Sequence, residues 1–275
     1  MSPLWREQIR IGIGSDRVDL VRLGRGWSPR VIDTHSVEFS ADPELSLWQS
    51  PVNALQQCLD SLKATSTSAT CSIVMGNAWV RYQLMPWHEG LANEQEYTAY
   101  AALHMQTIYG NLADKWHITC GEVRYGCATL VCAIERELVD HLRRVVADHG
   151  LPLHALRPFL SAAVMRWRRR ISMRDYWFAL IDGQRICLLN AAAGQPRLLR
   201  TQRFRSDTGA ELNAMLRLES IGLNQSSAVP PVYAFCPEAT PALLAEMNAA
   251  KVRVLDAASY LAPMQSNAKF ALALT

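Results

Sequence analysis

The residues of this chain best suited to chemistry lie at the tip of a predicted hairpin near its start. Residues 9–23 read IRIGIGSDRVDLVRL, in which two alternating apolar runs flank Gly14-Ser15-Asp16. This pattern predicts a β-hairpin whose tip carries small and acidic residues. A tip of this kind can cradle a phosphate group. Whether it does so decides between a nucleotide-binding protein and a scaffold.

Other common chemistries lack their residues. Gly12-x-Gly14 begins a dinucleotide-binding motif, but Arg17 replaces the third glycine and a strand follows where the motif needs a helix. No G-x-S-x-G nucleophile motif is present in the sequence. The seven histidines are scattered without metal-ligand spacing, so we expect no metal site.

Composition indicates a globular protein with ample core material. The chain has 275 residues, of which 49% are hydrophobic and 19% charged, enough for two related lobes. A net charge of +3 argues against a dedicated nucleic-acid-binding protein. The seven cysteines show no C-x-x-C spacing, and several lie in apolar runs, so we expect buried, reduced thiols and a cytoplasmic protein.

Membrane insertion is not expected. The first ten residues, MSPLWREQIR, contain no apolar signal core. The longest uncharged stretch, residues 64–80, is rich in Ser and Thr and is interrupted by Gly76 and Asn77. A membrane-spanning helix needs about 20 mostly apolar residues. We therefore expect a soluble protein.

The two halves of the chain are predicted to share one order of elements. Each runs strand-strand-strand-helix-strand-helix, and the first half contains an additional strand-helix-strand-strand block near residues 77–134. In that block Asn93 and Glu96 form a capping-box pattern before a helix that Gly110 ends. The expected strands cover 9–23 (two), 30–39, 71–75, 79–85, 116–124, 128–134, 177–181, 185–190, 197–204, 232–235 and 252–255. The expected helices cover 52–63, 93–109, 135–149, 208–218 and 241–248.

This repetition predicts an α/β protein with tandem ribonuclease H-like, actin-type lobes. We assign residues 1–157 to the first lobe, including an inserted β-α-β-β subdomain at about 77–134. Residues 158–275 form the second lobe.

Three stretches carry a resemblance to a known family. They are IGIGSDRVDLVRL at the start, WVRYQLMPW before the helix at 93, and HGLPLHALRPFLSAAVMR at the join between the lobes. Together they resemble the FtsA-type actin-like proteins PilM, MshI and the cytoplasmic part of GspL. The resemblance extends to about residue 255. It implies the actin-like fold and a role in a type IV pilus or type II secretion machine.

The family's nucleotide positions are altered in this chain. Gly12 stands where PilM and FtsA have an aspartate that organises the metal, and glycine has no oxygen ligand for it. The second phosphate loop should read Asp-x-Gly and then Thr or Ser, whereas this chain has Asp182-Gly183-Gln184-Arg185, which also suits an ordinary turn. The glycine pair expected after the strand at 232 is replaced by Phe235-Cys236-Pro237-Glu238. We therefore expect no cofactor and no enzymatic activity.

The resemblance also implies partners. It implies a PilN-like or GspM-like inner-membrane protein and a link to a secretion or pilus motor ATPase, and it leaves a homodimer open. In PilM, a cytoplasmic peptide of PilN lies in a groove beside the inserted subdomain. The matching candidates here are the aromatic residues Trp79, Tyr82, Tyr97 and Tyr100.

Two further hypotheses concern charged residues. The densest basic run, RWRRR at 166–170, is either a solvated helix end or a contact for anionic lipid or an acidic partner through Arg166, Arg168, Arg169 and Arg170. The alternative to a scaffold is a divergent ATP-binding protein that uses magnesium, with Gly14, Ser15 and Asp16 at one phosphate loop and Asp182 at the other. In that case Asp16, Asp19 or Asp182 replaces the lost acid, and Asp16 at the tip is the best placed of the three.

Overall fold

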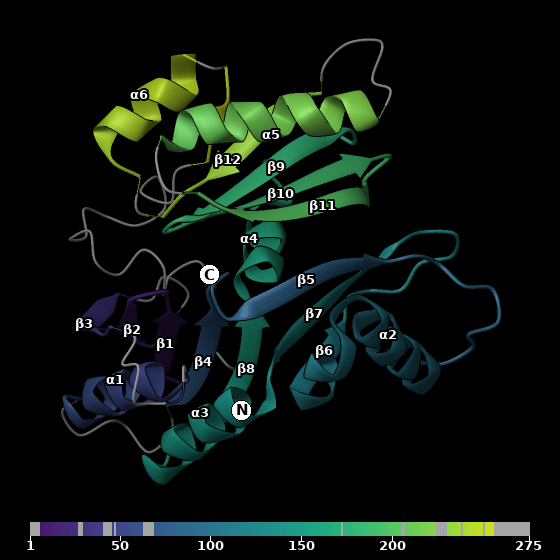
Figure 1. Cartoon of the computed structure of the whole chain (residues 1–275). Helices are drawn as coiled ribbons and strands as arrows, with labels where there is room; N and C mark the ends of the chain where they lie inside the picture. The colour runs from purple at the N-terminus through teal and green to yellow at the C-terminus, as the bar shows by residue number, and fades with distance from the viewer. Residues whose placement is uncertain are drawn as a thin grey trace.

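A computed structural model describes residues 6–26, 30–40, 46, 48–62, 69–171, 173–204, 207–223, 230–237, 239–249 and 251–255. Its elements form two stacked lobes and a smaller unit at the side of the first lobe (Figure 1). No helix in the described part of the chain is both long enough and apolar enough to cross a bilayer.

The first lobe is built on a five-stranded sheet in the order β3-β2-β1-β4-β8. These strands are β1 (Gln8–Ile13), β2 (Arg17–Leu23), β3 (Val31–Glu38), β4 (Thr70–Met75) and β8 (Leu153–Pro158). The first three are antiparallel, and β4 and β8 continue the sheet in parallel from β1. Helices α1 (Gln49–Asp60) and α3 (Arg136–Asp148) lie side by side against this sheet (Figure 1).

The second lobe repeats this arrangement in the order β11-β10-β9-β12-β13. Its strands are β9 (Tyr176–Asp182), β10 (Arg185–Ala192), β11 (Gln195–Arg203), β12 (Val232–Phe235) and β13 (Arg253–Val254). Helices α5 (Thr208–Gly222) and α6 (Pro241–Ala249) cover the face that points away from the first lobe (Figure 1). Both sheets thus have the strand order 3-2-1-4-5, as expected for tandem ribonuclease H-like lobes.

Helix α4 (Phe159–Trp167) lies between the two sheets (Figure 1). Its Phe159, Leu160 and Trp167 are almost completely buried. One apolar cluster runs from Ile11 in the first sheet through α4 to Phe178 in the second. The lobes are therefore joined by a continuous core.

The inserted unit is a separate antiparallel sheet in the order β5-β7-β6 with one covering helix. It contains β5 (Val80–Met85), α2 (Glu94–Tyr109), a 3₁₀ helix η2 (Gly110–Lys115), β6 (Trp116–Cys120) and β7 (Thr129–Glu135). A small core that includes Met85, Met105 and Val131 holds α2 on the sheet. The predicted cap is present, because Asn93 Oδ1 accepts a hydrogen bond from the Glu96 N–H at 3.0 Å.

The observed elements follow the predicted order with shifted ends. Helix α5 extends to Gly222, and α1 begins at Gln49, three residues before the predicted start. Strand β6 ends at Cys120, four residues before the predicted end, and the Gly121 N–H donates one more hydrogen bond to the Leu130 carbonyl at 2.7 Å. Strand β8 and helix α4 lie in the stretch HGLPLHALRPFLSAAVMR, which is similar to the family's strand and following helix at the join between the lobes.

All seven cysteines are free in the structure. Four of them, Cys58, Cys71, Cys132 and Cys187, are buried, and burial raises the pKa of each thiol to about 12. A thiol with such a pKa is protonated at neutral pH and is a poor nucleophile. These cysteines therefore act as small apolar core residues.

Candidate functional site

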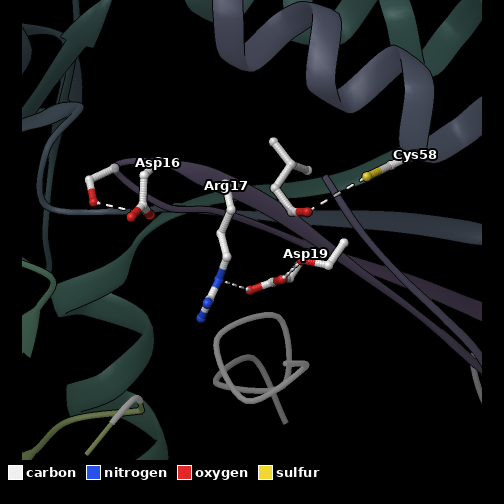
Figure 2. Close-up of polar contacts among 7 residues, drawn as sticks. Asp16, Arg17, Asp19 and Cys58 are labelled. Carbon is white, nitrogen blue, oxygen red and sulfur yellow. Dashed lines mark hydrogen bonds and ion pairs between the residues drawn. The ribbon is translucent and has the colours of Figure 1, made fainter. Parts of the chain in front are cut away.

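The first predicted phosphate loop is the tip between β1 and β2. Gly14 N–H donates to the Arg17 carbonyl at 2.9 Å and closes the turn. Ser15 and Asp16 are exposed, and the Ser15 hydroxyl donates to Asp16 Oδ1 at 3.4 Å. Asp16 thus lies at the tip, apart from the charged pair formed by Arg17 and Asp19 (Figure 2).

Asp19 is the carboxylate beside Gly12. The two residues are directly paired across β1 and β2, so their side-chain positions share one face of the sheet. The Asp19 side chain is only 2% exposed and accepts hydrogen bonds from Ser36 Oγ at 2.7 Å and Arg17 Nε at 3.2 Å (Figure 2). Burial raises its pKa, although the contacts with Ser36 and Arg17 oppose that shift. Asp19, rather than Asp16, therefore occupies the place next to the missing acid, but protein donors hold its oxygens.

The second predicted phosphate loop touches the first. Gly183 begins the turn between β9 and β10 with φ +52°, and a Cβ atom on it would lie 3.0 Å from Ser15 Oγ. The preceding Asp182 is almost buried, and its Oδ2 accepts a hydrogen bond from the Asn77 N–H at 2.6 Å. The two tips are in contact, and Asp182 connects the second lobe to the segment after β4.

The segment between β4 and β5 reaches both hairpins. Trp79 Nε1 donates to the Gly14 carbonyl at 2.6 Å. The buried Tyr82 hydroxyl donates to Asn77 Oδ1 at 3.1 Å and accepts from the Leu160 N–H at 3.2 Å. Burial raises the pKa of Tyr82 well above its usual value, so this hydroxyl keeps its proton. These contacts tie the tip of β1–β2, the inserted unit and α4 together.

The third predicted nucleotide position is filled by Phe235 at the end of β12. Its ring is 1% exposed and lies 5.4 Å from the ring of Trp167 and 5.9 Å from that of Phe159, both edge-on. An aromatic cluster therefore stands where the sequence resemblance leads us to expect a glycine pair.

Protein donors hold two of the three carboxylates that could replace the missing acid. A bound magnesium ion requires carboxylate oxygens that can face its water shell. Here Asp19 is held by Arg17 and Ser36, and Asp182 is held by Asn77. In the described ranges no three His, Cys, Asp or Glu side chains are close enough to hold a metal ion.

The aromatic residues predicted to bind a partner fall into two groups. Tyr82 is in the core, and Trp79 is half-buried against Phe39 and Gly14, so both serve the junction described above. Tyr97 and Tyr100 lie on α2, half-buried, and Tyr97 lines a surface hollow of about 660 Å³. The structure does not bring the four together as one patch.

That hollow belongs to a larger feature centred on β6, which the sequence did not single out. β6 is an edge strand, paired only with β7 among the described strands. Two hollows, of about 660 and about 770 Å³, lie between β6 and α2 and share Thr98 and Ile118. A third, of about 200 Å³, separates β6 from β8 and is lined by His117, Thr119, Arg143 and His154 among others.

The predicted basic run begins in the last turn of α4. Trp167 is buried, and the Arg166 guanidinium lies over its ring, 5.4 Å from the centroid. Arg168, Arg169 and Arg170 are exposed. The buried indole therefore fixes the position of the three exposed arginines relative to both lobes.

Comparison with known proteins gives a fold and no sequence match. No family model matches the chain, and no curated protein sequence does. Among solved structures, the chain is similar to one in the PilM–PilN type IV pilus biogenesis complex. The two have a TM-score of 0.64 and 15% sequence identity, and the match covers 98% of this chain and 97% of that one. The cytoplasmic domain of EpsL, an inner-membrane component of the type II secretion system of Vibrio cholerae, is 8% identical, with a TM-score of 0.56 over 97% and 93%.

A third similar structure is described as having an actin-like ATPase fold. It is a protein of unknown function with an actin-like ATPase fold from Bacteroides thetaiotaomicron, 12% identical, with a TM-score of 0.62 over 93% of this chain and 94% of that one. Together with the two sheets of order 3-2-1-4-5, these full-length matches confirm the predicted architecture. The chain has the actin-like ATPase fold, in the form shared by PilM and the cytoplasmic domain of EpsL.

Proposed function

We propose that this protein is a non-catalytic scaffold of a type IV pilus or type II secretion-like assembly. It lies on the cytoplasmic side of a bacterial inner membrane, binds the cytoplasmic segment of a PilN-like or GspM-like membrane protein, and links it to the cytoplasmic motor. The observation that carries the proposal is the similarity over the whole chain to a structure of the PilM–PilN complex, combined with strand β6, which has a partner on one side only among the described strands.

The proposed absence of enzymatic activity is supported by the contacts at the predicted nucleotide positions. Ser15 and Gly183 bring the two hairpin tips together, Asp182 is bonded to Asn77, and Phe235 is part of the core. At each of these positions the family binds nucleotide, whereas here the side chain or turn contacts another part of the protein and holds the fold together. A protein of this kind needs no bound nucleotide to keep its lobes together.

Strand β6 is the proposed docking edge for the partner segment. An extended peptide can add to an exposed strand, with main-chain hydrogen bonds for affinity and pockets for alternate side chains. On β6, Trp116, Ile118 and Cys120 line the hollows beside α2 alone, whereas His117 and Thr119 each line one of these hollows and also the one beside β8. A segment added to β6 would lie beside the hollows on both sides of this strand.

A tryptophan at position 98 tests this docking edge. Thr98 is exposed and lines both hollows beside α2, so we expect Thr98→Trp to fill them and weaken partner binding by about tenfold or more, about 1.4 kcal/mol. The probe is a synthetic peptide of the cytoplasmic segment of a PilN-like protein encoded beside this gene. Calorimetry gives its dissociation constant.

Thr107→Trp is the matched control. Thr107 lies exposed on the same helix, and both threonine hydroxyls bond the carbonyl four residues earlier, at 2.8 Å for Thr98 and 2.9 Å for Thr107. Thr107 lines none of the three hollows around β6. Equal binding by wild type, Thr98→Trp and Thr107→Trp would remove β6 as the docking edge.

The association with a membrane is supported by the basic run after α4. The exposed arginines 168–170 can contact anionic headgroups, with about 1 kcal/mol expected from each. Reversing all three charges to glutamate should therefore reduce binding to anionic vesicles by about a hundredfold. Sedimentation of the vesicles measures the fraction of protein bound, and Arg217→Glu on α5 is the control. Unchanged sedimentation of the triple variant would contradict this role.

A further inference from the structure

Strand β3 forms an outer edge of the first sheet (Figure 1). Within the described part of the chain it pairs with β2 alone, regularly from Asp33 to Glu38 and with one irregularity near Val31. Every second residue from Ile32 to Glu38 is exposed. An edge of this kind is a template for pairing with another strand.

The backbone groups of β3 that face outward can be assigned. The Phe39 N–H donates to the Asp16 carbonyl at 2.7 Å, so Phe39 faces β2. Alternate residues of an antiparallel strand direct their N–H and C=O groups to the same side. Asp33 and His35 therefore also face β2, and Thr34 between them faces outward. The Thr34 N–H accordingly donates to the Asp33 side chain, at 2.9 Å from Oδ1.

The carboxylate of Asp33 covers this outward donor at the surface. Its Oδ1 accepts the Thr34 N–H, and its Oδ2 lies 3.1 Å from His35 Nε2. The Asp33 and His35 side chains are both partly exposed, at 32% and 25%. A second strand can therefore replace these side-chain bonds without disturbing the pairing of β3 with β2.

The sequence of β3 complements itself when two copies run antiparallel around Thr34. In that register Thr34 lies opposite Thr34 of the second copy, and Asp33 lies opposite His35 on both sides of the axis. The two outward Thr34 residues can exchange N–H and C=O hydrogen bonds. Each imidazole N–H can donate to a carboxylate of the other copy. Threonine pairs and pairs of opposite polarity stabilise antiparallel sheets when they lie directly opposite each other.

Neighbouring registers lack this match. An axis at Asp33 would oppose two carboxylates, which is destabilising, and an axis at His35 would oppose two imidazoles. The ends of β3 also favour the Thr34 register. Exposed Arg30 precedes the strand and exposed Glu38 ends it, so an antiparallel pair brings each arginine toward the end where the other copy has its glutamate.

We propose that β3 is a self-association edge, at which two copies of this protein join their first sheets around a two-fold axis at Thr34. A two-fold axis gives both copies the same contacts. One strand pair is a small interface, below about 1,200 Å², so the dimer is weak and depends on concentration. The edge lies at the other end of the first sheet from β8, beside which the proposed docking edge β6 lies. Either proposal can therefore fail without the other.

A cysteine at the axis tests the register. Opposite residues of a hydrogen-bonded antiparallel pair have Cα atoms about 5.5 Å apart, within the span of a disulfide. Under mild oxidation by copper phenanthroline, Thr34→Cys should give several-fold more covalent dimer on a non-reducing gel than the wild type, whose seven cysteines are free.

Glu38→Cys is the matched control for cross-linking. It lies exposed at the end of the same strand, but in the Thr34 register it is roughly 26 Å from its counterpart. It should therefore cross-link no more than the wild type. Equal cross-linking of the two variants, or no gain for Thr34→Cys over the wild type, would overturn the proposal.

Charge exchange across the axis is an independent test, measured by sedimentation velocity from micromolar to millimolar concentration. His35→Glu places a carboxylate opposite Asp33 of the other copy and should weaken the dimer by about tenfold. Adding Asp33→Lys restores opposite charges and should restore the dimer. Arg197→Gln, which removes one exposed positive charge from the edge strand β11, should dimerise like the wild type.

The remaining outcomes count against self-association. Thermal unfolding shows that each variant is folded; among folded variants, an unweakened dimer of His35→Glu or an unrescued double variant would overturn the proposal. Thr34→Pro removes one outward N–H and leaves the pairing with β2 in place. If the wild type stayed monomeric and Thr34→Pro bound the PilN-like peptide more weakly, β3 would be an edge for that partner and not for a second copy.

Discussion

Replacing Phe235 with alanine is expected to lower the free energy of unfolding by about 3–5 kcal/mol, the usual cost of removing a buried aromatic ring. The ring is 1% exposed and contacts Phe159 and Trp167 edge-on, at centroid distances of 5.9 and 5.4 Å. It also joins the second sheet to α4, so the loss should loosen the lobes relative to each other. Urea unfolding measures the stability, and hydrogen exchange of α4 measures the loosening.

Tyr125→Ala provides the comparison for this substitution. Its ring is 84% exposed and contacts Trp87 at a centroid distance of 4.8 Å, so its removal should cost about 1 kcal/mol or less. If Phe235→Ala were as mild as Tyr125→Ala, the ring would not be a core contact between the lobes. If it also created affinity for adenosine, the position would still be a nucleotide pocket blocked by one side chain.

The fold could be predicted because its signals are local. The β1–β2 hairpin follows from alternation around Gly14-Ser15-Asp16, and α2 follows from the Asn93 cap and Gly110. The order of such elements, repeated in two halves, was enough to indicate tandem lobes. β8 has no comparable pattern, because Leu153–Pro158 mixes His154 and Arg157 with apolar residues in a short strand.

The site could be predicted only in part, because its contacts join distant residues. Asn77 and Asp182 are 105 positions apart, and no local pattern predicts that one bonds the other. The place of Asp19 beside Gly12 depends on the register of two strands, which places Asp19, and not the tip residue Asp16, next to the missing acid.

Removing the Asp182 carboxylate is expected to destabilise the junction between the lobes. In Asp182→Ala the buried Asn77 N–H loses its acceptor at 2.6 Å, which costs about 1–3 kcal/mol when a buried donor is left unsatisfied. For a chain of this size, that corresponds to a fall in melting temperature of about 2–4 °C per kcal/mol. Thermal unfolding measures this fall, and hydrogen exchange at Asn77 should rise with it.

Asp175→Ala is the matched control. Asp175 Oδ1 also accepts a backbone N–H at 2.6 Å, from Ala193, but this bond is exposed and lies within the second lobe. Water can replace the lost acceptor there, so the cost should be only about 0.5–1 kcal/mol. If the two variants were equally mild, Asp182 would not be a structural link between the lobes.

The same variant separates the scaffold from the ATP-binding alternative. A ligand that binds only the folded state raises its stability in proportion to the logarithm of ligand concentration over the dissociation constant. If the Asp182–Asn77 contact is structural, Asp182→Ala should melt below the wild type by the same interval with or without ATP and magnesium. A wild type that ATP and magnesium stabilise, and an Asp182→Ala variant that they do not, would overturn the scaffold proposal.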